Sequence, residues 1–244
     1  MAIKNQSIPN STRFTNAYNV IDNALRVQYN FKNNVTFSDL IRRCSSLNTV
    51  IRVYEDDLVD FARLRNAIIH NKSEQVIAEP HTEVVELMEK IARLVSTPPL
   101  AIDAIKSGDV AVIDCKATIR DLMLTTGKVG YSSIPIYNGN ELIGVMRWRK
   151  LVEVLATYVI AQGQNIDDFI NNTTLENFLH RFPCNMHFTL TTNTITIEET
   201  LTLFNHNRKL ACIIITPDGS SHKRPLGIIT GADVMDLMKI LEDY

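Results

Sequence analysis

A seven-residue segment near the C-terminus combines residue types that bind sugar hydroxyls. It reads GIITGAD over residues 227–233, after a run of β-branched residues and before an apolar helical pattern. Thr230 is expected to cap that helix, which places its hydroxyl beside free backbone N–H groups. Asp233, one turn further, offers a carboxylate that accepts both hydroxyls of a ribose. Gly227 allows a ligand or a neighbouring strand to approach the backbone.

Two interpretations of these charged residues stay open. An acid such as Asp233 in the first turn of a helix is also favoured by the helix dipole alone. An earlier segment, GVMRWRK at residues 144–150, carries Arg147 where the later one has Thr230, and Lys150 where it has Asp233. Cations at a helix N-terminus bind phosphate, or they form a solvated basic turn. Further basic candidates are Arg208, Lys209, Lys223 and Arg224, and the last two are expected to be exposed on a loop tip.

The two segments end the two copies of an internal repeat. TIRD at residues 118–121 aligns with TIEE at 196–199, and residues 134–137 align with 212–215, a period of roughly 80 residues. Short β-branched runs alternate with helical patterns, which is typical of an α/β arrangement. The strands are expected at 110–113, 134–137, 142–146, 190–197, 211–216 and 226–230. The hairpin loop at 217–225 is longer than its counterpart at 138–140.

This order of elements and the GIITGAD segment resemble the cystathionine-β-synthase (CBS) domain family. Its units run β-α-β-β-α and carry Gly, two apolar residues, Thr or Ser, two free positions and Asp. The resemblance covers the chain from about Pro98 to Tyr244. It implies an α+β/α/β fold with a small helical domain at 1–97 and CBS domains at 98–165 and 166–244. The two CBS domains are expected to pack as a pseudo-twofold pair.

The resemblance also implies a ligand and a role. The chain is expected to be a regulatory sensor of an adenine nucleotide or adenosyl compound: AMP, ADP, ATP, S-adenosylmethionine or a cyclic dinucleotide, with no metal. Adenine would lie in the groove between the copies, against the backbone near Thr189, Cys212 and Ile213. A homodimer is expected, and the sequence does not identify the regulated partner.

The first copy departs from the family pattern at Arg147 and Lys150. In paired CBS domains the two sites face one another, with phosphates near the middle. The two cations would then reach the phosphates of a ligand held by Thr230 and Asp233. One nucleoside per chain is therefore expected.

The first hundred residues are predicted to form a helical domain of three or four helices. The expected helices begin at Ser11 or Thr12, at Thr36, near Val50 and at Pro80. The apolar stripe over 53–68 exceeds what one short bundle needs to bury, which favours a symmetric pair.

Arg65 and His70 support an alternative function. RNAIIH at residues 65–70 resembles the Arg-x-x-x-x-His signature of HEPN-type helical domains, many of which are ribonucleases with a site at a dimer interface. The arginine would hold a scissile phosphate while the histidine transfers a proton. A histidine there also suits a helix C-terminus. The alternative is thus a nucleotide-regulated ribonuclease.

Composition and spacing exclude several other classes of function. The net charge of −2 argues against a broad nucleic-acid-binding face. The cysteines Cys44, Cys115, Cys184 and Cys212 are scattered, with no pair spaced for zinc or redox chemistry. The polar N-terminus and the lack of a long apolar window predict a cytoplasmic protein with no membrane association. No phosphate loop, serine elbow or metal-spaced His/Glu set is present.

Overall fold

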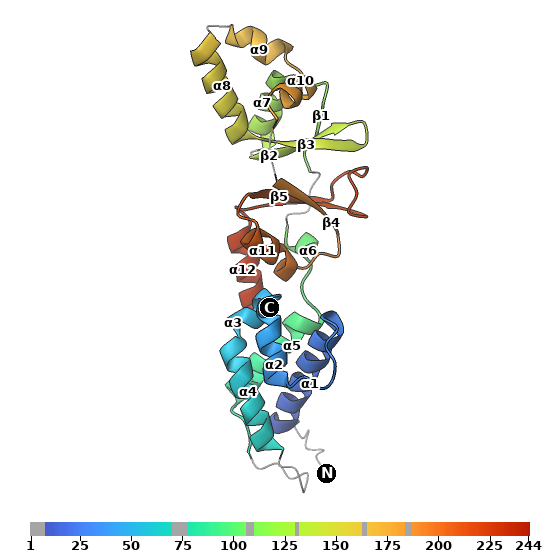
Figure 1. Cartoon of the computed structure of the whole chain (residues 1–244), viewed down its shortest axis with the longest axis vertical. Helices are drawn as coiled ribbons and strands as arrows, with labels where there is room; N and C mark the ends of the chain where they lie inside the picture. The colour runs from blue at the N-terminus through green and yellow to red at the C-terminus, as the bar shows by residue number, and fades with distance from the viewer. Residues whose placement is uncertain (1–7, 70–77, 106–109, 130–131, 163–164, 184–186) are drawn as a thin grey trace, which may run out of the picture. The chain divides into compact units, whose positions relative to one another are not determined.

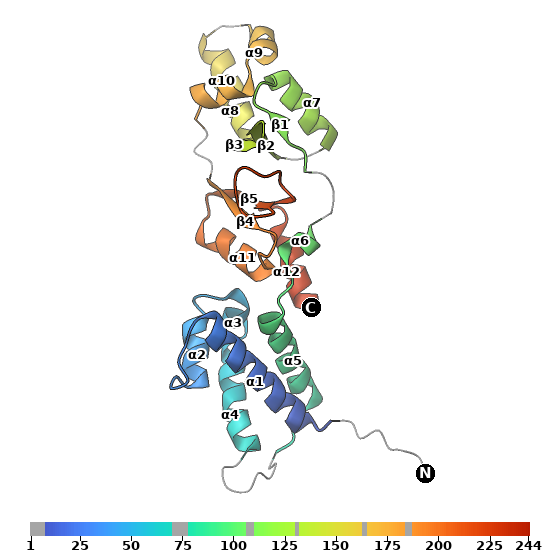
Figure 2. The same ribbon diagram turned by 90° about the vertical axis from the view of Figure 1, so that its right-hand side faces the viewer.

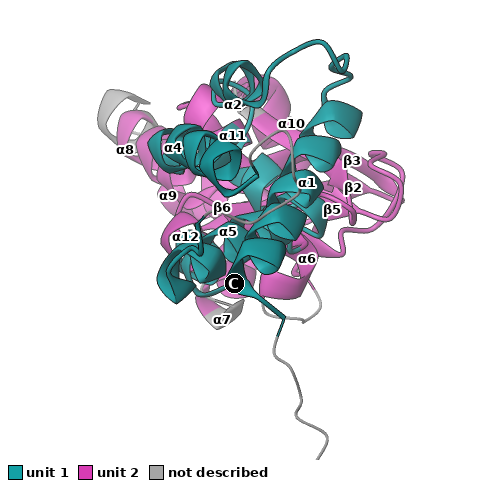
Figure 3. Ribbon diagram, turned by 90° about the horizontal axis from the view of Figure 1, so that it is seen from below, with its two compact units in different colours: residues 1–99, 196–202, 238–244 teal, residues 100–195, 203–237 magenta. Residues whose placement is uncertain are grey.

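The computed structural model describes residues 8–69, 78–105, 110–129, 132–162, 165–183 and 187–244. Contacts divide the chain into two compact units (Figure 3). Unit 1 holds residues 1–99 with 196–202 and 238–244, and unit 2 holds 100–195 and 203–237. The predicted mixed fold is confirmed, because a helical domain is followed by two copies of a β-α-β-β-α unit.

The helical domain is built on residues that recur at three- and four-residue steps. Its helices are α1 (Asn10–Gln28), α2 (Phe37–Cys44), α3 (Thr49–Val53), α4 (Glu55–Ile68) and α5 (Thr82–Ser96). α1 and α5 lie side by side (Figure 2). Phe14, Ile21, Leu58, Met88 and Ile91 are fully buried in their common core. One face of each helix therefore supplies the packing, as the periodicity predicted.

Two helix boundaries differ from the prediction. The helix expected from Val50 to residue 68 is interrupted at Tyr54, whose φ of −106° and ψ of 20° are not helical, so α3 and α4 are separate. The expected cap at Ser11 or Thr12 is wrong, since α1 begins at Asn10 and no side chain of its own caps it. Instead the buried Ser11 N–H donates to Glu79 Oε1 at 3.1 Å. That bond comes from a distant part of the sequence.

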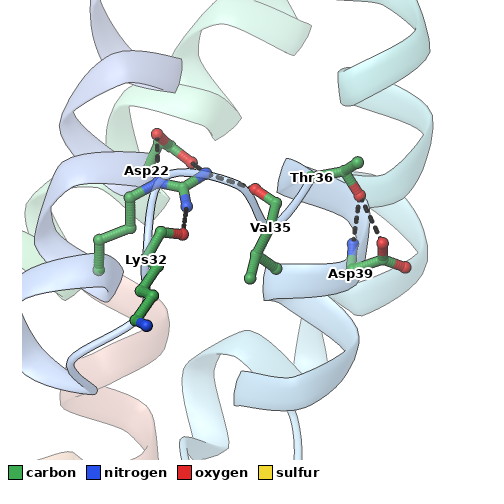
Figure 4. A network of polar contacts seen from close by, with 6 residues as sticks. Asp22, Lys32, Val35, Thr36 and Asp39 are labelled. Atoms are coloured by element: carbon green, nitrogen blue, oxygen red, sulfur yellow. Dashed lines mark hydrogen bonds and ion pairs between the residues drawn. The ribbon is translucent and has the colours of Figure 1, made fainter.

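The connection between α1 and α2 is held by one guanidinium (Figure 4). Arg26 donates two bonds to the Asp22 carboxylate, and it donates to the carbonyls of Lys32 at 2.8 Å and Val35 at 2.9 Å. The next residue, Thr36, accepts from the backbone N–H of Asp39 and begins α2, as predicted. The bonds of Arg26 thus fix the entry to α2.

Each repeat copy forms one three-stranded sheet (Figure 1). The first contains β1 (Ile113–Asp114), α7 (Ile119–Val129), β2 (Ser133–Asn138), β3 (Glu141–Arg147) and α8 (Trp148–Gln162). The second contains β4 (His187–Thr192), α11 (Ile197–His206), β5 (Leu210–Thr216), β6 (Gly227–Thr230) and α12 (Val234–Asp243). In both sheets the first strand pairs parallel with the second, and the second pairs antiparallel with the third. The internal repeat in the sequence is therefore a repeat of topology.

Some expected strand limits differ from the structure. The run expected at 190–197 is divided, because β4 ends at Thr192 and Ile197 already begins α11. The strand expected at 110–113 is reduced to the two residues of β1.

The helices that precede each copy pack on the other copy's sheet. They are α6 (Ala101–Ala104) before the first copy, and α9 (Ile166–Asn172) and α10 (Leu175–Arg181) before the second. Leu175 N–H donates to the Ala117 carbonyl at 2.9 Å, and Ala101 N–H donates to the Ile195 carbonyl at 2.9 Å. Phe178 is fully buried in the core of the first sheet.

This exchange bears on the predicted boundary between residues 165 and 166. Phe169, Leu175 and Phe178 lie after that boundary but complete the core of the first copy. We therefore propose that the first copy extends through Phe182 and that the second begins with β4.

The two sheets of unit 2 face one another through a shared apolar cluster. Tyr137 and Val145 from the first sheet pack with Cys212 and Ile214 from the second. The longer hairpin of the second copy bonds to the first sheet, where Leu142 N–H donates to the Ser221 carbonyl at 2.8 Å. The Tyr137 hydroxyl donates to the Lys223 carbonyl at 2.9 Å. The ends of these facing strands form the candidate site.

Candidate nucleotide site

Thr230 and Asp233 form a closed turn between β6 and α12. Asp233 Oδ2 accepts from the backbone N–H of Thr230 at 2.7 Å and from its hydroxyl at 2.9 Å. The Thr230 hydroxyl oxygen accepts from the Ala232 N–H at 3.3 Å. One carboxylate oxygen of Asp233 is thus bonded within the turn, and no described side chain bonds to the other oxygen.

The same arrangement recurs at three other helix starts. A threonine and an acid three residues later bond to each other in the pairs Thr36–Asp39, Thr118–Asp121 and Thr196–Glu199. Each is a capping arrangement that satisfies N–H groups at a helix start. The bonds within the Thr230–Asp233 turn therefore do not by themselves indicate a ligand. What distinguishes this turn is burial, because Asp233 is half-buried while the other three acids are exposed.

The position of Thr230 follows from the register of the second sheet. Thr230 lies opposite Cys212 on β5, and Cys212 lies opposite Phe188 on β4. Ile228 packs against the cluster between the sheets. Since alternate residues of a strand share a face, Thr230 faces the same side as Ile228. Thr230 therefore lies at the edge of the contact between the two copies.

Arg147 reaches this edge from the first copy. It is the last residue of β3, and it shares a face with Val145, which packs in the cluster between the sheets. Burial raises the pKa of the Cys212 thiol to about 12, and the positive charge of Arg147 acts on that pKa in the opposite direction. Arg147, Cys212 and Thr230 therefore all lie on the sides of their sheets that face the contact between the two copies. Arg147 itself is exposed.

Gly227 contacts a neighbouring segment. A β-carbon added there would lie 2.1 Å from Ile105 Cδ1 and 3.2 Å from Ile102 Cδ1. The sequence predicted that a ligand or a neighbouring strand approaches the backbone at this glycine. In the structure another part of the chain approaches it, namely the segment that carries α6. The absent side chain of Gly227 is the sequence signal that pointed to this contact, but the sequence did not identify its partner.

Thr189 and Ile213 lie opposite each other, one row further along the sheet. Strand alternation turns their side chains away from the cluster between the sheets, so only their backbone lies near the site. Lys150 is half-buried in the first turn of α8. The additional basic candidates Arg208, Lys209, Lys223 and Arg224 are all exposed.

Of the alternative pair, only Arg65 is described, and His70 lies outside the described residues. The Arg65 guanidinium lies over the Tyr18 ring, 5.7 Å from its centroid. Its Nε is buried and has no hydrogen-bond partner among the described residues. Burial raises the pKa of the Tyr18 hydroxyl to about 12, to which the nearby Asp22 contributes.

Within the described ranges, His, Cys, Asp and Glu side chains form no group of three that could hold a metal ion. None of the helices described here is long and apolar enough to cross a bilayer. Cys44, Cys115 and Cys212 are free, buried thiols, and Cys184 lies outside the described residues.

No protein-family model matches the sequence, and no curated protein matches it. Solved structures do match. The CBS domain of a bacterial CNNM/CorC-family Mg²⁺ transporter in complex with ATP is 19% identical, over 63% of this chain and 95% of that chain, with a TM-score of 0.43. The CBS-domain pair of protein MJ0100, in complex with 5′-methylthioadenosine and S-adenosyl-L-methionine, is 13% identical over 60% and 98%, with a TM-score of 0.39.

A further match is a Methanocaldococcus jannaschii protein described as a putative archaeal homologue of γ-AMPK. It is 14% identical over 68% of this chain and 55% of that chain, with a TM-score of 0.45. The solved structures to which this chain is similar are those of CBS-domain proteins.

Proposed function

We propose that the chain is a regulatory sensor that binds one phosphorylated adenosine compound at the edge between its two repeat copies. Asp233 would accept the ribose hydroxyls, and Arg147 with Lys150 would bind the phosphates. The observation that carries this proposal is the strand geometry: Arg147 shares a face of β3 with Val145, which packs with Cys212, and Cys212 lies opposite Thr230. A carboxylate and a guanidinium thereby border one edge, which suits a ligand with a diol and an anion.

Asp233 and Arg147 offer different chemistry to the ligand, and this difference would orient it. Asp233 keeps one carboxylate oxygen outside its turn and is half-buried, so a hydroxyl donor there replaces little water. Arg147 is exposed and carries no described ion pair, so its five N–H donors are open to a phosphate. Adenine would then lie against the backbone of β4 and β5 near Thr189, Cys212 and Ile213.

Thermal unfolding tests the proposal across the ligand class. A compound that binds only the folded chain raises the melting temperature with the logarithm of its concentration. We expect ATP or ADP to raise it more than adenosine does, with S-adenosylmethionine and a cyclic dinucleotide as comparisons. Calorimetry should then give one site per chain. If none of these compounds stabilises the chain, the proposal is wrong.

We also propose that the chain forms a homodimer, but not through the stripe expected from the sequence. Leu58, Phe61 and Ile68 of that stripe are 0%, 9% and 1% exposed, so they are used within the helical domain, whereas Val53 at its start is 68% exposed. Exposed apolar side chains elsewhere, such as Trp148 and Val152 on α8, offer a surface instead. Sedimentation at micromolar concentration tests this, and a single monomeric species would exclude it.

A ribonuclease remains the second candidate function because of Arg65. The guanidinium of half-buried Arg65 is oriented by its stacking on Tyr18, and its terminal nitrogens would have to bind the phosphate, because its Nε is buried. Purified wild-type chain should cleave RNA and Arg65→Ala should not, if this function is real. An inactive wild type would remove this candidate and leave the sensor.

A further inference from the structure

An apolar pocket lies entirely within unit 1. Its volume is about 140 Å³, and its apolar lining comes from α3, α5, α11 and α12: Val50, Val53, Leu94, Leu201, Met238 and Leu241. All of these residues belong to unit 1, because this unit includes residues 196–202 and 238–244 besides 1–99. None of them takes part in the proposed nucleotide site. The pocket is therefore a separate feature of the chain.

The spacing of the lining residues places them on two helix faces. Residues three and four positions apart lie on the same face of a helix. Two helices contribute this pattern to the pocket, with Val50, Val53 and Tyr54 from α3 and its end, and Met238, Leu241 and Glu242 from α12. Each set of three ends on a polar side chain. The lining thus combines an apolar part with the phenol of Tyr54 and the carboxylate of Glu242.

The pocket is deep and still open to solvent. Val50, Leu94 and Leu201 are 5%, 3% and 5% exposed, so they form its buried part. Val53 and Met238 are 68% and 43% exposed, so they border its entrance. Protein interiors are normally close-packed, and apolar surface left in contact with water is unfavourable. An apolar group that entered this space would be stabilised by burial.

Hydrogen bonds hold the helices around the pocket in place. The Glu198 carboxylate of α11 accepts from the Thr49 N–H of α3 at 2.6 Å and from the Thr202 hydroxyl at 2.9 Å. Glu198 is only 5% exposed. Lys90 Nζ of α5 donates to the Glu242 carbonyl of α12. Because such bonds are directional, they keep the four helices at set positions and the pocket is preformed.

The polar part of the lining carries a free negative charge. Glu242 is exposed, and within the described residues its carboxylate makes no hydrogen bond or ion pair, since Lys90 binds its main-chain oxygen instead. Burial raises the pKa of the Tyr54 hydroxyl, and the charges of Asp57 and Glu242 raise it further. The phenol therefore stays neutral beside two acids. A ligand that complements this pocket has an apolar body and a cationic end.

We propose that this pocket binds a small arylalkylamine, with its ring in the apolar space and its ammonium group paired with the Glu242 carboxylate. A cavity of roughly 150 Å³ lined by aliphatic and aromatic side chains binds benzene, so one ring matches this volume. Burial of the ring supplies the affinity, and the carboxylate selects the charge of the ligand. This inference does not depend on the proposed nucleotide function.

An NMR titration of the full chain without nucleotide tests this inference with three probes of one shape. They are 2-phenylethylamine, 2-phenylethanol and 3-phenylpropionate, which end in a cation, a neutral group and an anion. We expect saturable shifts at the backbone amides of Val50, Val53 and Leu94. The amine should bind about twofold to fivefold more tightly than the alcohol, because an exposed ion pair adds little, and the anion should bind most weakly.

Three variants separate shape from charge. Glu242→Gln keeps the size of the side chain and should bring the amine and the alcohol to within about twofold of each other. Asp243→Asn removes the exposed acid next to it, which does not line the pocket, and should keep the preference for the amine. Met238→Trp fills the entrance and should weaken all three probes about tenfold or more. Unchanged amide signals away from the pocket show that each variant is folded.

Several outcomes would overturn the inference. Shifts that do not saturate below about 10 mM, or equal binding by wild type and Met238→Trp, would show that the pocket holds no such ligand. Equal affinities for the three probes would remove the assignment of an amine. Affinity that falls as the protein concentration rises would show that a second copy of the chain fills the pocket instead. None of these results bears on ATP binding, so the sensor proposal is tested separately.

Discussion

The two repeat copies share every strand and differ at the turn that follows the hairpin. In the second copy three residues separate β6 from α12, and Thr230 and Asp233 bond across them. In the first copy α8 begins at Trp148, directly after β3 ends at Arg147. Without the threonine and the acid, the first copy forms no such capped turn.

The consequence is a difference in charge at equivalent places. The second copy positions a half-buried carboxylate, and the first positions an exposed guanidinium. Two identical nucleoside sites would need a carboxylate in each copy, and only the second copy has one at this turn. The two copies therefore share one scaffold and carry opposite charges at a single turn.

Removing the acid should have the largest effect on binding. Asp233→Ala deletes charge-assisted hydrogen bonds worth about 1.5–3 kcal/mol each, so ATP affinity should fall roughly tenfold or more. The matched control is Asp121→Ala, which removes the acid of a chemically similar but exposed capping turn at the start of α7. Calorimetry should show wild-type affinity for that control. Equal affinities for all three proteins would mean that the ligand site is elsewhere.

The two glycines that precede the turns should differ in stability. Gly227→Ala brings a methyl group 2.1 Å from Ile105 Cδ1, so we expect a loss of about 1–2 kcal/mol in the free energy of unfolding. Gly144→Ala meets the flexible end of the Leu179 side chain, with Cδ1 at 3.3 Å and Cδ2 at 3.9 Å, and should change the free energy of unfolding by about 0.5 kcal/mol or less. Urea unfolding measures both.

A double-mutant cycle sharpens this test. Ile105→Val removes the methyl group that the new β-carbon meets, so Gly227→Ala should cost less in that background. An unchanged cost would show that Ile105 does not fill the space over Gly227.

The cations of the first copy should act only on phosphates. Arg147→Ala and Lys150→Ala should each weaken ATP about threefold to tenfold and leave adenosine unaffected, and the loss should shrink at high salt. The exposed Lys116→Ala serves as a control cation in the first copy. A similar loss for adenosine would show that these residues hold the fold rather than a phosphate.

The smallest effect concerns pH. The bonds from the Thr118 N–H and hydroxyl lower the pKa of Asp121 below its ordinary value. A lowered folded-state pKa stabilises the fold above the unfolded pKa of about 4, and this contribution disappears as pH falls through the folded value. Asp121→Asn should therefore lower the melting temperature slightly at neutral pH, and this difference should shrink as the pH falls below about 4. A difference that stays constant with pH would contradict the role of this bond.

Much of the fold could be predicted because local patterns agreed with one another. The repeat, the strand runs and the Thr-x-x-acid segments each gave elements that the structure contains, including the cap at Thr36. The misses have a common cause. Ser11 was expected to cap α1, but its N–H is bonded by Glu79, and helix 50–68 divides at Tyr54. Such details depend on groups far away in the sequence or on backbone angles that periodicity does not reveal.

The sequence by itself determined the elements, their duplication and the residue types at each turn, because these follow from short-range periodicity and capping chemistry. Only the tertiary structure decided which turn is half-buried, since burial of Asp233 depends on what the other parts of the chain cover. It also decided that Arg147 lies near Cys212 and that Ile105 covers Gly227. Both contacts join residues that lie dozens of positions apart in the sequence. Local sequence patterns do not reveal such long-range packing.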